Sequence, residues 1–431
     1  MPSRVLFIVL DAFRSDYINP VDTPFLYSKI STGVYVEKLK STAGFTQRTA
    51  LYTGTAGSES GMFTMYTFDA KNSPFAFLRN HPRFVQFSAR SHWWNKLPPW
   101  RGLTVIKRLM DRRFKEHVQG FRGWIQQQAT KHANHAPVAN IPVWLLPEIG
   151  VSEDNRPIHL PGAFDQETIF DVLVREGIEY EYFMYPVVDG QDEAVLEAFL
   201  THKDSNTKIL MGQFSDSDQL IHHCGPSSPK RKQITGEIDR KLREIAAHYD
   251  ADTVWIILGD HGMTDVVEEL DIPALLEPLE RRHNVRMGRD YLLFLDSTMA
   301  RFRWITETGK EFLREVAQSL TLSGKGRFVD EQIAKEHSIP VVDRRYGDLI
   351  WWANIGVLLF PDYFHDEDTH NKGMHGYDSD HDDMKGFFLA FGSGIEPRRV
   401  DQANLIDVCP TICAAVGAPV TRSNRGICLL K

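Results

Sequence analysis

Cysteine is scarce in this chain: its 431 residues include only Cys224, Cys409, Cys413 and Cys428. Four thiols are too few for a disulfide scaffold, so we expect a reduced, cytoplasmic protein. Cys409 and Cys413 are four residues apart on a stretch that we expect to be helical, and no second thiol pair lies near them in the sequence. We therefore interpret them as small buried hydrophobic residues rather than as a metal site.

Long apolar runs and an excess of positive charge are also missing. No run of apolar residues is long enough to span a bilayer, and the first one, residues 5–10, is too short for a signal peptide. The net charge of −8 argues against a general nucleic-acid binder. The hydrophobic content of 42% is enough to bury a large core.

Strand and helix signals alternate along much of the chain. Apolar residues recur at helical spacing in residues 167–175, 229–249 and 405–416. Between these stretches lie continuous apolar runs, which are typical of strands buried on both faces. The pattern predicts an α/β fold with a mostly parallel sheet. The expected strands are residues 5–10, 180–185, 209–214, 254–258 and 387–391.

Two segments interrupt the alternation. Residues 69–162 carry proline, aromatic and basic residues without a clear order of elements. Residues 271–349 look like a separate α+β insertion, with a helix near residues 309–320. We expect both to be caps over the strand ends, and we expect the catalytic core to comprise residues 1–68, 163–270 and 350–431.

Carboxylates and imidazoles occur where the predicted strands end. Asp11 ends the first strand, and Asp260 and His261 follow the strand at 254–258, so all three belong at the carboxyl edge of a parallel sheet. Asp218 and His222 are four residues apart and would share one face of a helix. His375 lies in a glycine-flanked loop. Taken alone, Asp218 and His222 could be an exposed pair, Asp260 could cap a turn, and His375 could be a loop histidine without function. Together the three carboxylates and three imidazoles suit two zinc ions.

A hydrolase with such a metal centre also needs a nucleophile. Thr46 precedes a short helix-like stretch that ends at Gly54, where it would be an N-cap near the positive end of the helix dipole. Its hydroxyl could attack a phosphorus centre there. Thr42 and Thr49 are the rival candidates, and a plain capping role for Thr46 is the alternative.

The ordered set of motifs resembles the alkaline phosphatase superfamily and, within it, the type I phosphodiesterase/nucleotide pyrophosphatase family. The resemblance covers about half of the chain, and it is made specific by the order of the motifs and by the Gly-Pro pair after His222. The matching pieces are residues 9–14, 45–54, Asp218-x3-His222-x2-Gly225-Pro226, 259–263 and 375–378.

The resemblance implies a three-layer α/β/α sandwich and a division of the ligands between two zinc ions. Asp218, His222 and His375 would hold one ion. The other would be held by Asp11, Thr46, Asp260 and His261. Hydrolysis of a phosphodiester or pyrophosphate bond in a small phosphate ester or nucleotide would then proceed through a phosphothreonine.

The chain departs from the family pattern in the nucleophile loop. Family members of the eukaryotic type carry Thr-Phe-Pro-Asn-His there, and an ungapped count from Gly54 places Gly44 at the nucleophile position. A shorter loop, as in phosphonoacetate hydrolase-like members, makes Thr46 the nucleophile. The asparagine has no clear counterpart, so Arg48 or Gln47 is expected to contact the phosphoryl oxygen, although Arg48 fits a surface role equally well.

Residues 93–124 are rich in tryptophan and in basic residues. A cap helix with an apolar face on the core is the favoured interpretation. A substrate-binding cap and a membrane-surface helix are the alternatives.

Two other functions stay open at this point. A phosphomonoesterase or phosphonate hydrolase could use the same core, and a non-catalytic binding protein could keep the fold. The second is disfavoured because every expected ligand position is filled.

Overall fold

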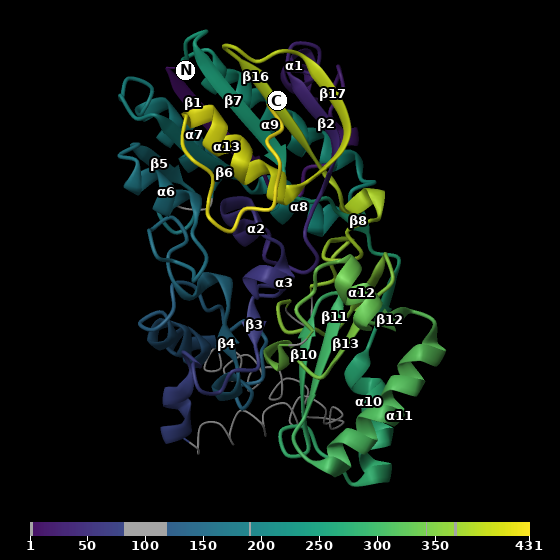
Figure 1. Ribbon diagram of the computed structural model, residues 1–431. Coiled ribbons are helices and arrows are strands. Elements are labelled where there is room, and N and C mark those ends of the chain that lie inside the picture. The colour runs from purple at the N-terminus through teal and green to yellow at the C-terminus, as the bar shows by residue number, and fades with distance from the viewer. Residues whose placement is uncertain (1–2, 82–118, 189–190, 342, 366–368) are drawn as a thin grey trace.

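The computed structural model describes residues 3–81, 119–188, 191–341, 343–365 and 369–431. Figure 1 shows two lobes, with a large sheet in the upper one and a smaller sheet in the lower one. The large sheet has seven strands in the order β17-β2-β16-β7-β1-β6-β5. These strands are Arg398–Asn404, Val34–Lys40, Gly386–Gly392, Thr253–Gly259, Arg4–Leu10, Ile209–Phe214 and Tyr180–Phe183.

The middle of this sheet is parallel, as the sequence predicts. β1 pairs in parallel with β6 and with β7, and β5 pairs in parallel with β6. β16 alone runs antiparallel to its two neighbours, β7 and β2, while β17 pairs in parallel with β2. The predicted mostly parallel sheet is therefore confirmed.

Helices cover both faces of the sheet because side chains along β1 alternate between two cores. Val5, Phe7 and Val9 pack with α2 (Gln47–Thr53), α6 (Ile169–Arg175) and α13 (Val408–Val416). Leu6, Ile8 and Leu10 pack on the opposite face. The helices there are α1 (Pro24–Lys29), α7 (Asp192–Thr201), α8 (Asp216–Cys224) and α9 (Pro229–Ala246). The result is the expected three-layer sandwich.

The second lobe contains a four-stranded antiparallel sheet in the order β10-β11-β13-β12. Its strands are Tyr291–Asp296, Met299–Trp304, Leu349–Ala353 and Gly326–Phe328, and its helices are α10 (Ile272–His283), α11 (Glu307–Ser323) and α12 (Glu331–Glu336). The helix predicted near residues 309–320 is α11. Buried residues of the 69–162 segment, such as Phe75 and Ile149, share one core with Leu293 and Phe312 of this lobe.

Shorter elements complete the described chain. α3 is Gly57–Ser60, and three small sheets pair β3 (Tyr66–Thr67) with β4 (Gly150–Val151), β8 (Thr264–Asp265) with β15 (Gly373–Met374), and β9 (Glu268–Leu270) with β14 (Val357–Leu359). Among the described residues, no helix is both long and apolar enough to cross a membrane. Residues 93–118, most of the tryptophan-rich segment 93–124, lie outside the described residues.

Candidate metal centre

The carboxyl edge of the parallel strands gathers the predicted ligands. Asp11 follows β1, and Asp260 and His261 follow the neighbouring β7, with Leu10 and Gly259 paired at the strand ends. Because these strands are parallel and adjacent, their ends open onto the same edge of the sheet. Asp218 and His222 lie on α8, directly after β6, and His375 follows β15.

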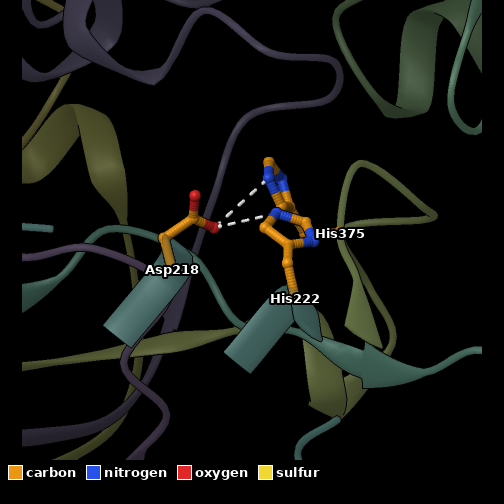
Figure 2. Close-up of side chains that lie close together, drawn as sticks. All are labelled: Asp218, His222 and His375. Atoms are coloured by element: carbon orange, nitrogen blue, oxygen red, sulfur yellow. Dashed lines mark ion pairs between the residues drawn. The ribbon is translucent and has the colours of Figure 1, made fainter. Parts of the chain in front are cut away.

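Asp218, His222 and His375 form one group of ligating atoms within 4.8 Å of one another. Asp218 Oδ1 lies 3.2 Å from His222 Nε2 and 3.5 Å from His375 Nε2. Figure 2 shows both imidazole rings turned toward this carboxylate. The i, i+4 pair therefore does share one helix face, and a loop distant in sequence supplies the third side chain.

Asp11, Asp218 and His261 form a second group with the same spread. His261 Nε2 lies 3.1 Å from Asp11 Oδ1 and 3.8 Å from Asp260 Oδ1. Asp260 stands beside this group and accepts a hydrogen bond from the His261 amide at 3.0 Å. Asp218 belongs to both groups, so the two sets of ligands are adjacent.

Backbone carbonyl groups fix the orientation of two of the imidazoles. His222 Nδ1 lies 2.8 Å from the Gly373 oxygen, and His261 Nδ1 lies 3.0 Å from the Gly262 oxygen. A carbonyl oxygen can only accept, so Nδ1 carries a proton and Nε2 is the ring nitrogen that faces the carboxylates. Histidine ligands of metals are typically held in this way by a second partner.

The electrostatics of the cluster also fit a bound cation. Burial lowers the pKa of His261, but the carboxylates of Asp260, Asp11 and Asp218 outweigh it and raise the pKa to about 10. Burial, together with Asp11 and Asp218, raises the pKa of Asp260 to about 7. In the protein without metal, a proton on His261 thus offsets the crowded carboxylates. A divalent cation would supply the same compensation.

The loop before α2 lies against the first group. The Phe45 ring packs edge-on against His375, with ring centroids 5.5 Å apart, and Phe45 N donates to the Phe63 oxygen at 2.9 Å. Gly44 has a φ of +84° and a Cβ there would lie 2.0 Å from the Phe63 oxygen, so only glycine fits. Thr46, which follows Phe45, is buried and is the N-cap of α2, as predicted.

Gln47 and Arg48 have partners within the protein. Gln47 Nε2 donates to the Gly44 oxygen at 3.0 Å. Arg48 Nε lies 3.3 Å from the Glu153 carboxylate, which comes from the 69–162 segment and is 4% exposed. The predicted contact of Gln47 or Arg48 with a phosphoryl oxygen stays a prediction. Sequence reasoning did not single out Glu153.

A third cluster of histidine and aspartate residues is different in kind. His337 lies near Asp378 and Asp380. Arg327 pairs with Asp378 at 2.6 Å, and Lys40 pairs with Asp380 at 2.5 Å. These two cations already neutralise both carboxylates, so we interpret the cluster as an ion-pair network between β2, β12 and the loop after His375.

Comparisons with known proteins show the family of the chain and its fold. The model of the family "Type I phosphodiesterase / nucleotide pyrophosphatase" matches residues 5–378. Ectonucleotide pyrophosphatase/phosphodiesterase family member 5 of Homo sapiens is 24% identical over 428 residues, which are 95% of this chain and 73% of the relative.

Two solved structures show the same fold. Human ectonucleotide pyrophosphatase/phosphodiesterase 5 superposes with a TM-score of 0.64 at 17% identity, covering 98% of this chain and 97% of that one. An inactive threonine-to-alanine variant of the murine protein, in complex with AMP, superposes with a TM-score of 0.62 at 16% identity, covering 97% and 96%. Because the family model matches the chain from β1 to the loop after His375, the chain belongs to the type I phosphodiesterase/nucleotide pyrophosphatase family and is a phosphodiester hydrolase.

Proposed function

We propose that the chain hydrolyses phosphodiester or pyrophosphate bonds of small nucleotide-like substrates, with Thr46 as nucleophile and two zinc ions as cofactors. The observation that carries the proposal is the orientation of His222 and His261. Both rings are anchored through Nδ1 to carbonyl oxygens, and both turn Nε2 toward carboxylates. Three imidazoles and three carboxylates in one cluster are a donor set that suits zinc.

The residues present fit two ions. Asp218, His222 and His375 would hold one, and Asp11, Asp260, His261 and Thr46 would hold the other. Asp218 Oδ1 is buried and lies within 3.5 Å of both His222 Nε2 and His375 Nε2, which is consistent with an oxygen placed for a cation. When bound, the ions would supply Lewis-acid stabilisation of charge on the phosphate oxygens and activation of the oxygen nucleophiles.

The protein's own residues would perform the rest of the reaction. The Thr46 oxygen would form a bond to phosphorus as the oxygen of the leaving group departs, and water would then cleave the phosphothreonine. Gln213 would hold Asp11 in place, because its amide donates to Asp11 Oδ2 at 2.7 Å. Phe45 would fix the nucleophile loop against His375.

A nucleotide is the proposed substrate class. The murine relative is described in complex with AMP, in a variant that lacks a threonine and is inactive. That description supports both a nucleotide substrate and a threonine nucleophile for this chain.

Initial rates on bis(p-nitrophenyl) phosphate and on p-nitrophenyl phosphate test the proposal. We expect a preference for the diester that disappears after chelation and returns with added zinc. A preference for the monoester would favour the phosphomonoesterase alternative, and activity that survives exhaustive chelation would contradict a metal-dependent reaction.

A further inference from the structure

The carboxylate of Glu153 occupies the start of the helix that follows Thr46. Glu153 begins a short 3-10 turn, Glu153–Asn155, in the segment that joins the two lobes. Its Oε1 accepts from the Thr49 amide at 2.5 Å and from the Thr49 hydroxyl at 2.6 Å. Its Oε2 lies 3.3 Å from Arg48 Nε. A buried acid from the 69–162 segment thus accepts from the third amide of α2, that of Thr49.

This contact replaces the bond that Thr46 would ordinarily make. An N-cap threonine normally accepts, through its hydroxyl oxygen, from the amide of the second or third helical residue. In this chain Thr168 and Thr306 do so, accepting from Asp171 N and Gly309 N, each three residues on. Thr46 is also an N-cap, and the amide three residues on belongs to Thr49, but its side chain makes no capping hydrogen bond.

We propose that Glu153 is a positioning residue that keeps the Thr46 hydroxyl available for reaction by taking over its capping bond at Thr49. The inference rests on the proposed role of Thr46 as nucleophile. If the Thr46 hydroxyl oxygen accepted a hydrogen bond from the Thr49 amide, one of its lone pairs would be occupied and the side-chain rotamer would be fixed. That hydrogen bond would have to break before the oxygen could attack phosphorus. With the amide and hydroxyl of Thr49 held by Glu153, the Thr49 amide needs no acceptor from Thr46.

The same contact has a simpler interpretation, in which Glu153 only ties its segment to α2. Both interpretations predict a loss of stability when the Glu153 side chain is removed, since the buried Thr49 amide then loses its acceptor. They differ in kcat. Only the positioning role predicts that a folded variant binds substrate and metal normally and yet reacts slowly. Only that role predicts that kcat is restored by a neutral side chain that still accepts from Thr49.

The experiment compares Glu153→Ala and Glu153→Gln with the full-length wild-type protein on bis(p-nitrophenyl) phosphate. We expect Glu153→Ala to lower kcat about tenfold, equivalent to about 1.4 kcal/mol, with KM and zinc content unchanged. Glu153→Gln retains an oxygen that accepts from Thr49 and should stay within about threefold of the wild-type kcat. A crystal structure of Glu153→Ala should show the Thr46 hydroxyl within hydrogen-bond distance of the Thr49 amide.

Several results would overturn the inference. One is a folded Glu153→Ala variant with wild-type kcat; another is a pair of variants that lose kcat and melting temperature in parallel. If Glu153→Ala does not fold, a tenfold loss of kcat in a stable Glu153→Gln variant would overturn it as well. Thr46→Ala separates this outcome from failure of the proposed function: an active Thr46→Ala variant rejects the nucleophile, whereas an inactive one alongside a fully active Glu153→Ala variant rejects only the role of Glu153.

Discussion

His261 and His375 stack on each other, with ring centroids 4.2 Å apart and an angle of 26° between the ring planes. His261 belongs to the group with Asp11, and His375 belongs to the group with His222, so the contact joins the two proposed zinc sites. Two metal ions held by these adjacent groups would act on one phosphate together.

The stacked pair predicts strongly non-additive effects of mutation. His261→Ala and His375→Ala should each lower kcat/KM on a diester by about a thousandfold or more, and the double variant should lose little beyond either single variant, because one missing ion disables the shared site. Steady-state kinetics of the three variants measure this. Losses that multiply in the double variant would show that the two histidines act independently.

Replacement of the candidate nucleophile should separate Thr46 from its neighbours. We expect Thr46→Ala to abolish measurable diester hydrolysis while leaving the melting temperature close to wild type. Thr42→Ala is the matched control, since the Thr42 hydroxyl is buried without a hydrogen-bond partner among the described residues and should be dispensable. Thr49→Ala should keep activity, because its hydroxyl is bound to Glu153. Hydrolysis by Thr46→Ala at the wild-type rate would remove the assignment.

The Asp192 carboxyl group predicts a pH-dependent stability. Its Oδ1 accepts from the amides of Ser215 and Asp216 at the start of α8, and its burial, with the nearby Asp216 charge, raises its pKa to about 7. A carboxyl pKa that is raised on folding stabilises the protein fully below the unfolded value of about 3.9, and this contribution is lost as the pH rises toward 7. The Lys241 ammonium, 3.9 Å away, offsets part of the cost.

Asp192→Asn should remove this dependence. Relative to the variant, the wild-type protein should lose up to roughly 4 kcal/mol of stability between pH 4 and pH 7, from a shift of about three pKa units. Melting temperatures of both proteins across this range provide the measurement, with Asp250→Asn as the control at an exposed position. A difference between Asp192→Asn and wild type that stays constant with pH would contradict the prediction.

A buried ion pair in the second lobe should be costly to break. Arg301 and Asp296 are paired at 2.6 Å, and both side chains are almost fully buried. Arg301→Met leaves the Asp296 carboxylate without its partner and should lower the free energy of unfolding by about 3–5 kcal/mol. Arg301→Met combined with Asp296→Leu should recover much of the loss.

Denaturation midpoints of the single and double variants test this pair. The matched control is Arg240→Met, which breaks exposed pairs with Glu237 and Glu244 and should cost less than about 1 kcal/mol. A double variant less stable than Arg301→Met would contradict the prediction. It would show that the unpaired Asp296 carboxylate is not what destabilises the single variant.

The sequence predicted several of the elements whose pattern is local. The apolar run at residues 209–214 is strand β6, and the helical spacing at 229–249 corresponds to α9. β17 was not predicted, because its sequence RRVDQAN is polar and mostly exposed at the edge of the sheet. Pairing with β2 makes it a strand, and a one-dimensional pattern does not reveal that contact.

In the candidate site too, the residues in local patterns were predicted and those that depend on distant contacts were not. Asp11 and His261 were predicted to lie together because parallel strands end at one edge, and they do. Glu153 was missed because it is 104 residues from Thr49 and stands in no recognisable motif. The packing of Phe45 on His375 depends likewise on the folded chain. The cytoplasmic location expected from the few cysteines stays a prediction.

The number of zinc ions bound per chain tests the central claim most directly. We predict two ions in the zinc-reconstituted wild-type protein, measured by elemental analysis after removal of loosely bound metal, and one in each of His222→Ala and His261→Ala. A reconstituted wild-type protein that hydrolyses diesters without bound metal, or variants that still retain two ions, would contradict the account.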